Sequence, residues 1–300
     1  MVQKVKSSFG NTDIESVSVD PQFQKLDILI RLNDSSPNRL AILVEDKTHT
    51  SNHSNQLERY YDIVKEAGYD VSQMIPIYFK TGYQSKFDTI GEFRTYLRKD
   101  FLAVLQHGKQ HGLLNAIYDD FLDHLKQIDA LIKQFSIKHS TDWKYHDWVG
   151  FFTVLYDQRS SLSSPSDDDS TNWGYVANPA GGFVGYWWYF KQLAGRGFTP
   201  YLQLEEEKLC FKIMVDDDID RSAVRDEAYR SIVAGANKIG LVALRPERMG
   251  NGKYMTVGRL DKYRITTPDG LINVEATIKN LRRAQDIIDA AFPDSQPTDN

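Results

Sequence analysis

One stretch, residues 26–60, limits the possible folds of this chain more than any other. It contains two apolar runs, at residues 26–32 and 40–45, and the polar segment between them is rich in Asn, Asp, Ser and Pro. Apolar runs of this length that are bounded by turn-forming residues predict buried β-strands. The N-terminal core is therefore expected to be built on a sheet that contains both strands.

A helix is predicted to follow these two strands, beginning at Ser54 or Asn55 and ending at about Ala67. Glu58 stands three residues after Asn55, which is the spacing of a helix capping box. Gly68 comes directly after the apolar periodicity ends, and glycine is a typical stop signal for a helix.

Two further strands are predicted in this half of the chain. Residues 13–19 alternate apolar and polar side chains, as a half-buried strand does, and residues 73–79 form another apolar run. Pro76 weakens the second assignment, because proline favours an edge strand or a bulge. The order is strand, strand, strand, helix, strand, so the predicted fold class is α/β (α+β).

The rest of the chain is expected to form an α+β region after a helical segment. Apolar residues recur at helical spacing from Ile90 to Phe135, with a break near Gly108 and Gly112. Further strands are predicted at 173–177, 183–190, 201–204, 209–215, 240–244 and 254–259, with helices at 143–156, 221–234 and 271–292. A soft boundary near residue 140 divides the chain into a core with a helical extension, 1–140, and a C-terminal region, 141–300, that could pack on the core as one unit.

Composition excludes several classes of protein. The single cysteine, Cys210, allows no disulfide framework and no thiolate metal cluster. No apolar run approaches the length of a membrane span, and the first residues lack the hydrophobic region of a signal peptide, so a cytoplasmic location without membrane contact is expected. The net charge of −5 argues against a protein that coats nucleic acid, but it leaves room for a nucleic-acid enzyme with a local basic lining.

The two central strands carry a set of residues suited to metal-dependent hydrolysis. Asp27 opens the first strand, and Glu45 and Lys47 end the second, where alternation places both on the same face. If the strands pair, Asp27 and Glu45 can bind one divalent cation through oxygen. Lys47 could then orient a water molecule or offset charge that develops on a phosphoryl oxygen.

The predicted helix adds two polar residues to this set. Gln56 and Tyr60 are four residues apart, so they project from the same side of a helix. An acid-x-lysine triplet alone is a weak signal, since 26% of the residues are charged and two other triplets, at 142–144 and 206–208, occur in the chain. Neither follows an apolar strand that begins with Asp. The functional hypothesis therefore rests on the order of Asp27, Glu45, Lys47, Gln56 and Tyr60 along the chain, and not on the triplet alone.

These motifs resemble the core of the PD-(D/E)xK nuclease superfamily over residues 13–80. The resemblance implies a restriction-endonuclease-like core, in which a central mixed sheet is flanked by helices. It implies that Asp27 and Glu45 are metal ligands for Mg²⁺ or Mn²⁺ and that Lys47 is the catalytic lysine. The pair Gln56 and Tyr60 is similar to the Gln-x-x-x-Tyr motif of RecB-like and lambda-exonuclease-like members, and Glu15 is the candidate for a further acidic ligand.

The resemblance implies a nuclease that hydrolyses phosphodiester bonds of nucleic acid, with DNA as the expected substrate, typically in a bacterial setting. The alternative is an inactive nucleic-acid or protein-binding module that keeps the fold. Whether DNA or RNA is cut, from ends or internally, stays open, and so does the oligomeric state.

Other polar and aromatic groups have simpler interpretations. His49 and His53 are interpreted as polar loop residues, although they could contact phosphate. His107 and His111 could share a helix face and bind zinc, but no third ligand is apparent in the sequence. Acidic runs at 167–169, 205–207 and 216–218 are interpreted as solvated loops or helix ends. The aromatic run 186–190 has one face expected in the core, while the other could stack on bases or meet a partner.

Overall fold

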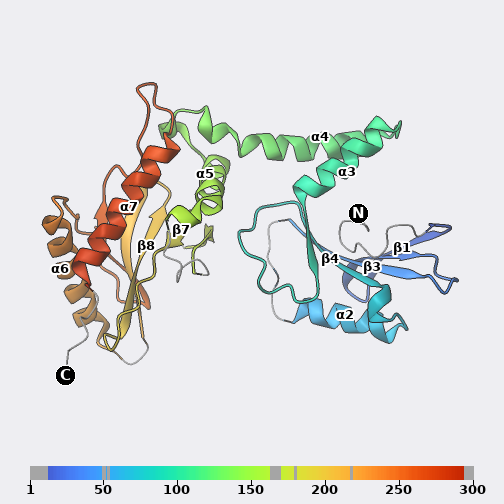
Figure 1. The fold of residues 1–300 in the computed structure, drawn as a ribbon, viewed down its shortest axis with the longest axis horizontal. Helices are drawn as coiled ribbons and strands as arrows, with labels where there is room; N and C mark the ends of the chain where they lie inside the picture. The colour runs from blue at the N-terminus through green and yellow to red at the C-terminus, as the bar shows by residue number, and fades with distance from the viewer. Residues whose placement is uncertain are drawn as a thin grey trace. The chain divides into compact units, whose positions relative to one another are not determined.

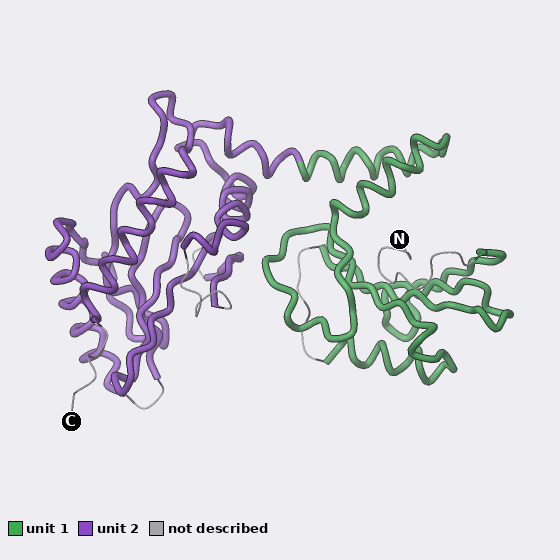
Figure 2. Tube along the Cα trace, in the orientation of Figure 1, with its two compact units in different colours: residues 1–129 green, residues 130–300 purple. Residues whose placement is uncertain are grey.

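The computed structural model describes residues 13–48, 52, 55–162, 170–178, 181–216 and 219–293. His49, His53 and the acidic run at 167–169 lie outside these residues. The chain divides into two compact units, residues 1–129 and 130–300, which are described separately (Figure 2). No helix among the described residues is long and apolar enough to cross a membrane.

A mixed β-sheet forms the centre of the first unit. Within the described residues its strands are β1 (Val17–Phe23), β2 (Leu26–Leu32), β3 (Leu40–Lys47), β4 (Met74–Lys80) and β5 (Arg94–Leu97), and they lie in that order across the sheet. The first three strands pair antiparallel, whereas β4 pairs parallel to β3 and β5 parallel to β4. The predicted order of strand, strand, strand, helix, strand is confirmed.

Helices cover both faces of this sheet. Helix α2 (Gln56–Glu66) lies against one face (Figure 1), where its Leu57, Tyr60 and Val64 pack on a cluster that includes Leu29 and Leu43. The opposite face holds a second apolar cluster of β2–β5 residues, against which Phe101 of α3 (Arg98–Gln110) packs. The predicted fold class, a mixed sheet flanked by helices as in restriction-endonuclease-like cores, is confirmed.

Two local predictions for the first unit were wrong. The helical segment expected from Ile90 begins instead with β5, because Tyr96 is buried in the sheet core and residues 94–97 continue the parallel ladder of β4. Pro76 does not mark an edge or a bulge: β4 lies between β3 and β5, with Pro76 in register with Leu43. The expected break near Gly108 and Gly112 is confirmed, since α3 ends at Gln110 and α4 (Ala116–Leu131) follows.

The second unit contains an antiparallel sheet with helices on one face. In its described part the strands are β6 (Asn172–Val176), β7 (Phe183–Trp188), β8 (Phe198–Glu205), β9 (Lys208–Val215) and β10 (Tyr254–Leu260), in the order β10-β9-β8-β7-β6. Its α-helices are α5 (Tyr145–Asp157), α6 (Arg221–Lys238) and α7 (Val274–Ala291). Among the described residues of both units, short 3-10 helices occur at Val71–Gln73, Gln134–Ser136, Ser140–Asp142 and Arg159–Ser161.

Side-chain contacts show which face of the second sheet the helices cover. Helix α5 packs on β6 and β7, α7 on β8, and α6 on β9 and β10. Phe152 of α5 contacts Tyr186, and Phe292 after α7 contacts Phe198. The strand predicted at 240–244 is absent from this described segment, where Leu244 makes only an isolated bridge to Arg259.

Candidate functional site

The paired strands β2 and β3 bring the predicted acidic residues together. Ile28 is in register with Val44, so the preceding Asp27 lies across from Glu45 at the end of the strand pair. Leu29 and Leu43, which share the faces of Asp27 and Glu45 by alternation, both belong to the cluster under α2. The two carboxylates, Lys47 and helix α2 therefore share one face of the sheet.

Glu45 is the centre of the contacts at this site. Its side chain is 1% exposed, and its Oε1 atom lies 2.5 Å from Lys47 Nζ. Gln56 Nε2 donates to the same Oε1 at 3.0 Å and lies 2.8 Å from the hydroxyl oxygen of Tyr60. Gln56, which also contacts Tyr60, therefore positions the Glu45 carboxylate, and Lys47 pairs with the same carboxylate.

The Asp27 carboxylate completes an unusual electrostatic environment. Its Oδ2 atom accepts the backbone N–H of Asp46 at 2.8 Å, which holds Asp27 against the end of β3. Burial raises the pKa of Glu45 above its ordinary value; the hydrogen bond from Lys47 lowers it, and the adjacent negative charge of Asp27 raises it again. Two close carboxylates, one of them buried, form a site in which an added positive charge is favourable.

The donor set fits a hard divalent cation. Glu45 Oε2 is buried and has no hydrogen-bond partner among the described residues, while Oε1 is held by Lys47 and Gln56. No group of three or more His, Cys, Asp and Glu side chains converges anywhere in the part of the chain that the structure describes. Mg²⁺ is commonly bound by one or two carboxylates together with water and substrate phosphate, so Asp27 and Glu45 are the residues that could hold such an ion.

Glu15 lies away from these two carboxylates. Its backbone N–H donates to Asn33 Oδ1 at 2.9 Å, and Asn33 follows the last residue of β2. Asp27 is near the first residue of that strand, so about 20 Å of extended chain separates it from Asn33. The geometry does not bring Glu15 to the site, so the prediction that Glu15 is a metal ligand is wrong for this structure.

Lys80 is a site residue that the sequence motifs did not indicate. It ends β4, is in register with Lys47 on the neighbouring strand, and is only 2% exposed. Burial, reinforced by the charge of Lys47 and opposed by that of Asp46, lowers the pKa of Lys80 to about 8. A lysine that ends an apolar strand is usually solvent-exposed, and only its parallel pairing with β3 reveals this position.

Lys80 should make the stability of the protein depend on pH. Between about pH 8 and its unfolded pKa of 10.5, Lys80 is mostly neutral in the folded state and protonated in the unfolded state. Because the unfolded state then binds more protons, the contribution of this residue to the free energy of unfolding rises with pH. From pH 7 to pH 10.5, we expect the unfolding free energy of wild type to rise by about 3 kcal/mol relative to that of Lys80→Met.

Urea denaturation of both proteins at several pH values measures this difference. Lys99→Met, at an exposed position of α3, is the matched control and should give a difference that is independent of pH. If the unfolding free energies of wild type and Lys80→Met changed with pH in the same way, Lys80 would not have a lowered pKa in the folded protein.

The basic residues after the core do not form one lining. Arg98 is 7% exposed, and its Nη1 donates to the carbonyl oxygen of Thr81 at 2.6 Å while its guanidinium lies over the ring of Tyr83. It is the first residue of α3 and packs against the residues that follow β4. Lys109 pairs with Asp119 at 2.6 Å, whereas Arg94 and Lys99 are exposed.

His107 and His111 do lie together, with ring centroids 4.0 Å apart, on an exposed part of α3 and the residue that ends it. His111 Nδ1 lies 2.8 Å from the carbonyl oxygen of His107. As the described residues contain no cluster of three ligands, this pair stays interpreted as a local surface contact.

Comparison with known proteins finds one family model that matches the N-terminal part of the chain. The model of the PD-(D/E)XK nuclease superfamily matches residues 2–144, just under half of the chain. Comparisons with curated proteins and with solved structures gave no match. The matched region contains the mixed sheet, α2 and every residue of the site described above. Over residues 2–144 the chain is therefore similar to the PD-(D/E)XK nuclease superfamily.

Proposed function

We propose that the first unit is a divalent-metal-dependent nuclease that hydrolyses phosphodiester bonds of DNA. The observation that carries the proposal is the state of the Glu45 carboxylate. One oxygen is held by Lys47 and Gln56, and the other is buried next to Asp27 with no partner among the described residues. Burial of an unpaired carboxylate oxygen costs free energy, which binding of a cation would recover.

The residues of the site divide into three roles. Asp27 and Glu45 would hold a Mg²⁺ or Mn²⁺ ion, whose chemistry when bound is to polarise a phosphoryl oxygen and activate water. The Lys47 ammonium stands beside Glu45, where it can orient water toward the phosphorus and offset charge on the phosphoryl oxygens. Lys80 adds a second positive group next to Lys47, and it gains protons as the pH falls through about 8.

Gln56 acts as a positioning residue in this scheme. Its amide contacts both Glu45 Oε1 and the Tyr60 hydroxyl, and Tyr60 is itself 4% exposed within the core under α2. The rotamer of Glu45 is thereby set by a helix that is packed on the sheet. A carboxylate fixed before the metal binds needs little reorganisation, which favours both metal affinity and rate.

The direct test is an assay of nucleic-acid cleavage by the full-length protein. Linear double-stranded, circular and single-stranded DNA, together with RNA, are each incubated with Mg²⁺, with Mn²⁺ and with EDTA. We expect DNA to be cleaved only with a divalent cation. Products from linear but not circular DNA would identify an exonuclease, and nicking or linearisation of circular DNA an endonuclease.

Three outcomes of this assay would overturn all or part of the proposal. Cleavage that continues in EDTA would exclude a metal mechanism at Asp27 and Glu45. No cleavage of any substrate, combined with DNA binding that does not depend on metal, would identify the inactive binding module instead. Cleavage of RNA alone would retain the metal mechanism and reject DNA as the substrate.

A further inference from the structure

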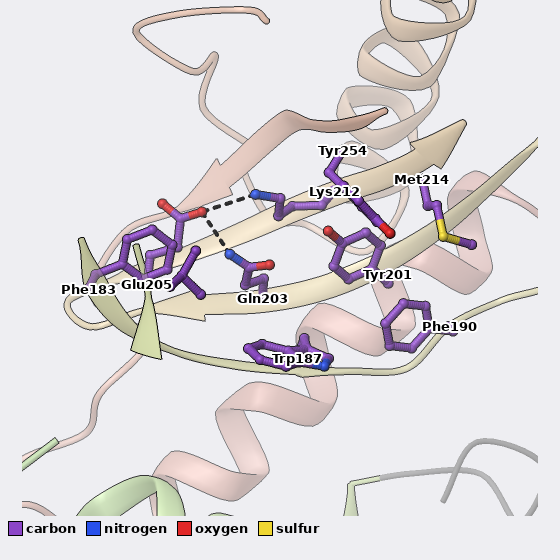
Figure 3. A pocket seen from close by; sticks show the side chains of 10 residues that line it. Phe183, Trp187, Phe190, Tyr201, Gln203, Glu205, Lys212, Met214 and Tyr254 are labelled. Carbon is purple, nitrogen blue, oxygen red and sulfur yellow. Dashed lines mark hydrogen bonds and ion pairs between the residues drawn. The ribbon is translucent and has the colours of Figure 1, made fainter. Parts of the chain in front are cut away.

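The second unit has a pocket on the sheet face that its helices do not cover (Figure 3). Alternation along β8 and β9 places Leu202 and Phe211 toward the helices and Tyr201 and Lys212 toward the pocket. The pocket has a volume of about 490 Å³, within the range of small-molecule sites. It is lined by Val176, Phe183, Trp187, Phe190, Tyr201, Gln203, Glu205, Lys212, Met214 and Tyr254.

Aromatic rings form the walls of this pocket. Phe190 stacks on Tyr201 with ring centroids 4.6 Å apart and planes only 6° apart. Trp187 is half-buried on the neighbouring strand β7, and Tyr254 of β10 is 59% exposed. Flat walls that are partly open to solvent suit the insertion of a flat ligand ring.

Polar groups converge between these walls. Gln203 is buried, and its Nε2 donates to Glu205 Oε1 at 3.0 Å. Lys212 Nζ contacts the same oxygen at 3.2 Å (Figure 3). Together the amide, the carboxylate and the ammonium provide both donors and acceptors to the edge of a ligand.

A second, basic pocket adjoins the first on the same sheet face. It has a volume of about 220 Å³, shares Glu205 with the aromatic pocket, and includes Lys208, Arg248 and Arg259. Arg259 Nη1 pairs with the exposed Glu247 at 3.2 Å, but its buried Nε has no hydrogen-bond partner among the residues described. Guanidinium and ammonium groups in this arrangement suit a phosphate.

Strand register connects the two pockets. Trp187 is in register with Gln203, Gln203 with Cys210, and Cys210 with Arg259, so these residues form one row across β7, β8, β9 and β10. The row runs from an aromatic wall, past a donor–acceptor edge, to a basic group. A nucleotide offers the matching sequence of a flat ring, a hydrogen-bonding edge and a phosphate.

We propose that this face of the second unit binds single-stranded nucleic acid, with a base in the aromatic pocket against Trp187 and backbone phosphate at the basic pocket. The site is separate from the carboxylate site of the first unit, and the proposal does not depend on nuclease activity. A free nucleotide and a nucleic-acid strand both offer a base with a phosphate. The experiment therefore tests free nucleotides as well as strands.

The test measures binding by the full-length protein in EDTA, which removes metal-dependent cleavage. Fluorescence anisotropy follows labelled DNA and RNA single strands of ten nucleotides, with nucleoside monophosphates as unlabelled competitors. We expect strands to bind and monophosphates to compete weakly, because each nucleotide unit adds contacts. Trp187→Ala should weaken strand binding at least about fivefold, as expected for the loss of one base–aromatic stack.

Matched variants separate recognition from folding. Trp187→Phe keeps an aromatic ring and should retain most of the affinity, whereas Tyr175→Ala removes an exposed ring from the opposite face of β6 and should change nothing. Arg259→Gln should lower the slope of log affinity against log salt concentration by about one, the value for one lost phosphate contact. Photocrosslinking with 5-iodouridine strands, followed by peptide mass spectrometry, should identify Trp187 or its neighbours in the pocket.

Specific results would overturn this site. Equal affinities of wild type, Trp187→Ala and Arg259→Gln would exclude it, and so would crosslinks found only in residues 1–129. Monophosphates that bind as tightly as strands would reassign the face to free nucleotides and overturn the strand proposal. Because every measurement is made without metal, a protein that fails to cleave DNA can still pass this test.

Discussion

Replacing Glu45 with Gln is expected to lower the rate of DNA cleavage by about 10³-fold or more. The substitution keeps the size of the side chain and an oxygen that can accept from Lys47 and Gln56, but it removes the negative charge beside Asp27. A metal ion supplies several kcal/mol of charge stabilisation in such reactions, and each 1.36 kcal/mol corresponds to a factor of ten in rate. Initial rates over a range of Mg²⁺ concentrations measure the loss, and isothermal titration calorimetry measures metal binding.

The neighbouring acid offers a matched control for this variant. Asp46→Asn removes the same charge one residue along the chain, from a side chain that is exposed. We expect its cleavage rate to stay within a few-fold of wild type. Lys47→Ala should lose activity and still bind metal, since the lysine is not a ligand. Equal losses for Glu45→Gln and Asp46→Asn would mean that overall negative charge, and not the position of Glu45, matters.

Gly82→Ala should destabilise the first unit by about 3 kcal/mol, the upper part of the usual range for overpacking. A Cβ atom at this position would lie 1.8 Å from the carbonyl oxygen of Thr48, which directly follows the end of β3. Neither the added Cβ atom nor the Thr48 carbonyl oxygen can rotate away, because both are fixed to the backbone. The end of β3 and the turn after β4 must therefore move apart. Thermal unfolding followed by circular dichroism should show a decrease in Tm of about 10 °C for the first unit.

The same movement should disturb the site itself. Thr48 is the neighbour of Lys47, and its hydroxyl lies 3.2 Å from that of Thr81, so displacement of this turn shifts Lys47 relative to Lys80. Cleavage by the Gly82→Ala protein should therefore fall even at temperatures where it is fully folded. Gly250→Ala, where no atom lies within 4 Å of the added Cβ, is the control and should keep both the Tm and the activity. An unchanged Tm for Gly82→Ala would contradict the close approach.

Local patterns predicted the elements that carry the nuclease motif. Strands β2 and β3 are continuous apolar runs bounded by turn residues, and α2 ends just before Gly68, so their sequences favour one local structure. Asn55 is the N-cap of α2 as predicted, but the capping box expected with Glu58 is not formed, since the Asn55 side chain makes no cap hydrogen bond. The i, i+4 spacing of Gln56 and Tyr60 and the alternation of Glu45 and Lys47 follow from the geometry of single elements. These residues meet in the structure because one antiparallel register and one helix packing are sufficient to join them.

Local sequence patterns did not predict the residues whose position depends on pairing with strands that are distant in the sequence. Strand β5 has an apolar spacing that also fits a helix, and only its parallel ladder with β4 selects the extended form. Pro76 was assigned to an edge or a bulge, yet β4 is interior. An arginine in a charged stretch such as residues 94–100 is usually exposed, yet the carbonyl oxygen of Thr81 and the ring of Tyr83 hold Arg98 inside.

By itself, then, the sequence indicated the similarity of residues 2–144 to the nuclease superfamily. It also predicted the set formed by Asp27, Glu45, Lys47, Gln56 and Tyr60, because that set depends on short-range periodicity and chemical type. Only the tertiary structure decided which other charges join that set. It placed Glu15 at the far end of β2 and brought Lys80 beside Lys47, and it aligned Trp187 with Arg259 across four strands. The physical reason is that strand register and burial are properties of paired strands, and no single strand encodes the partner that it will meet.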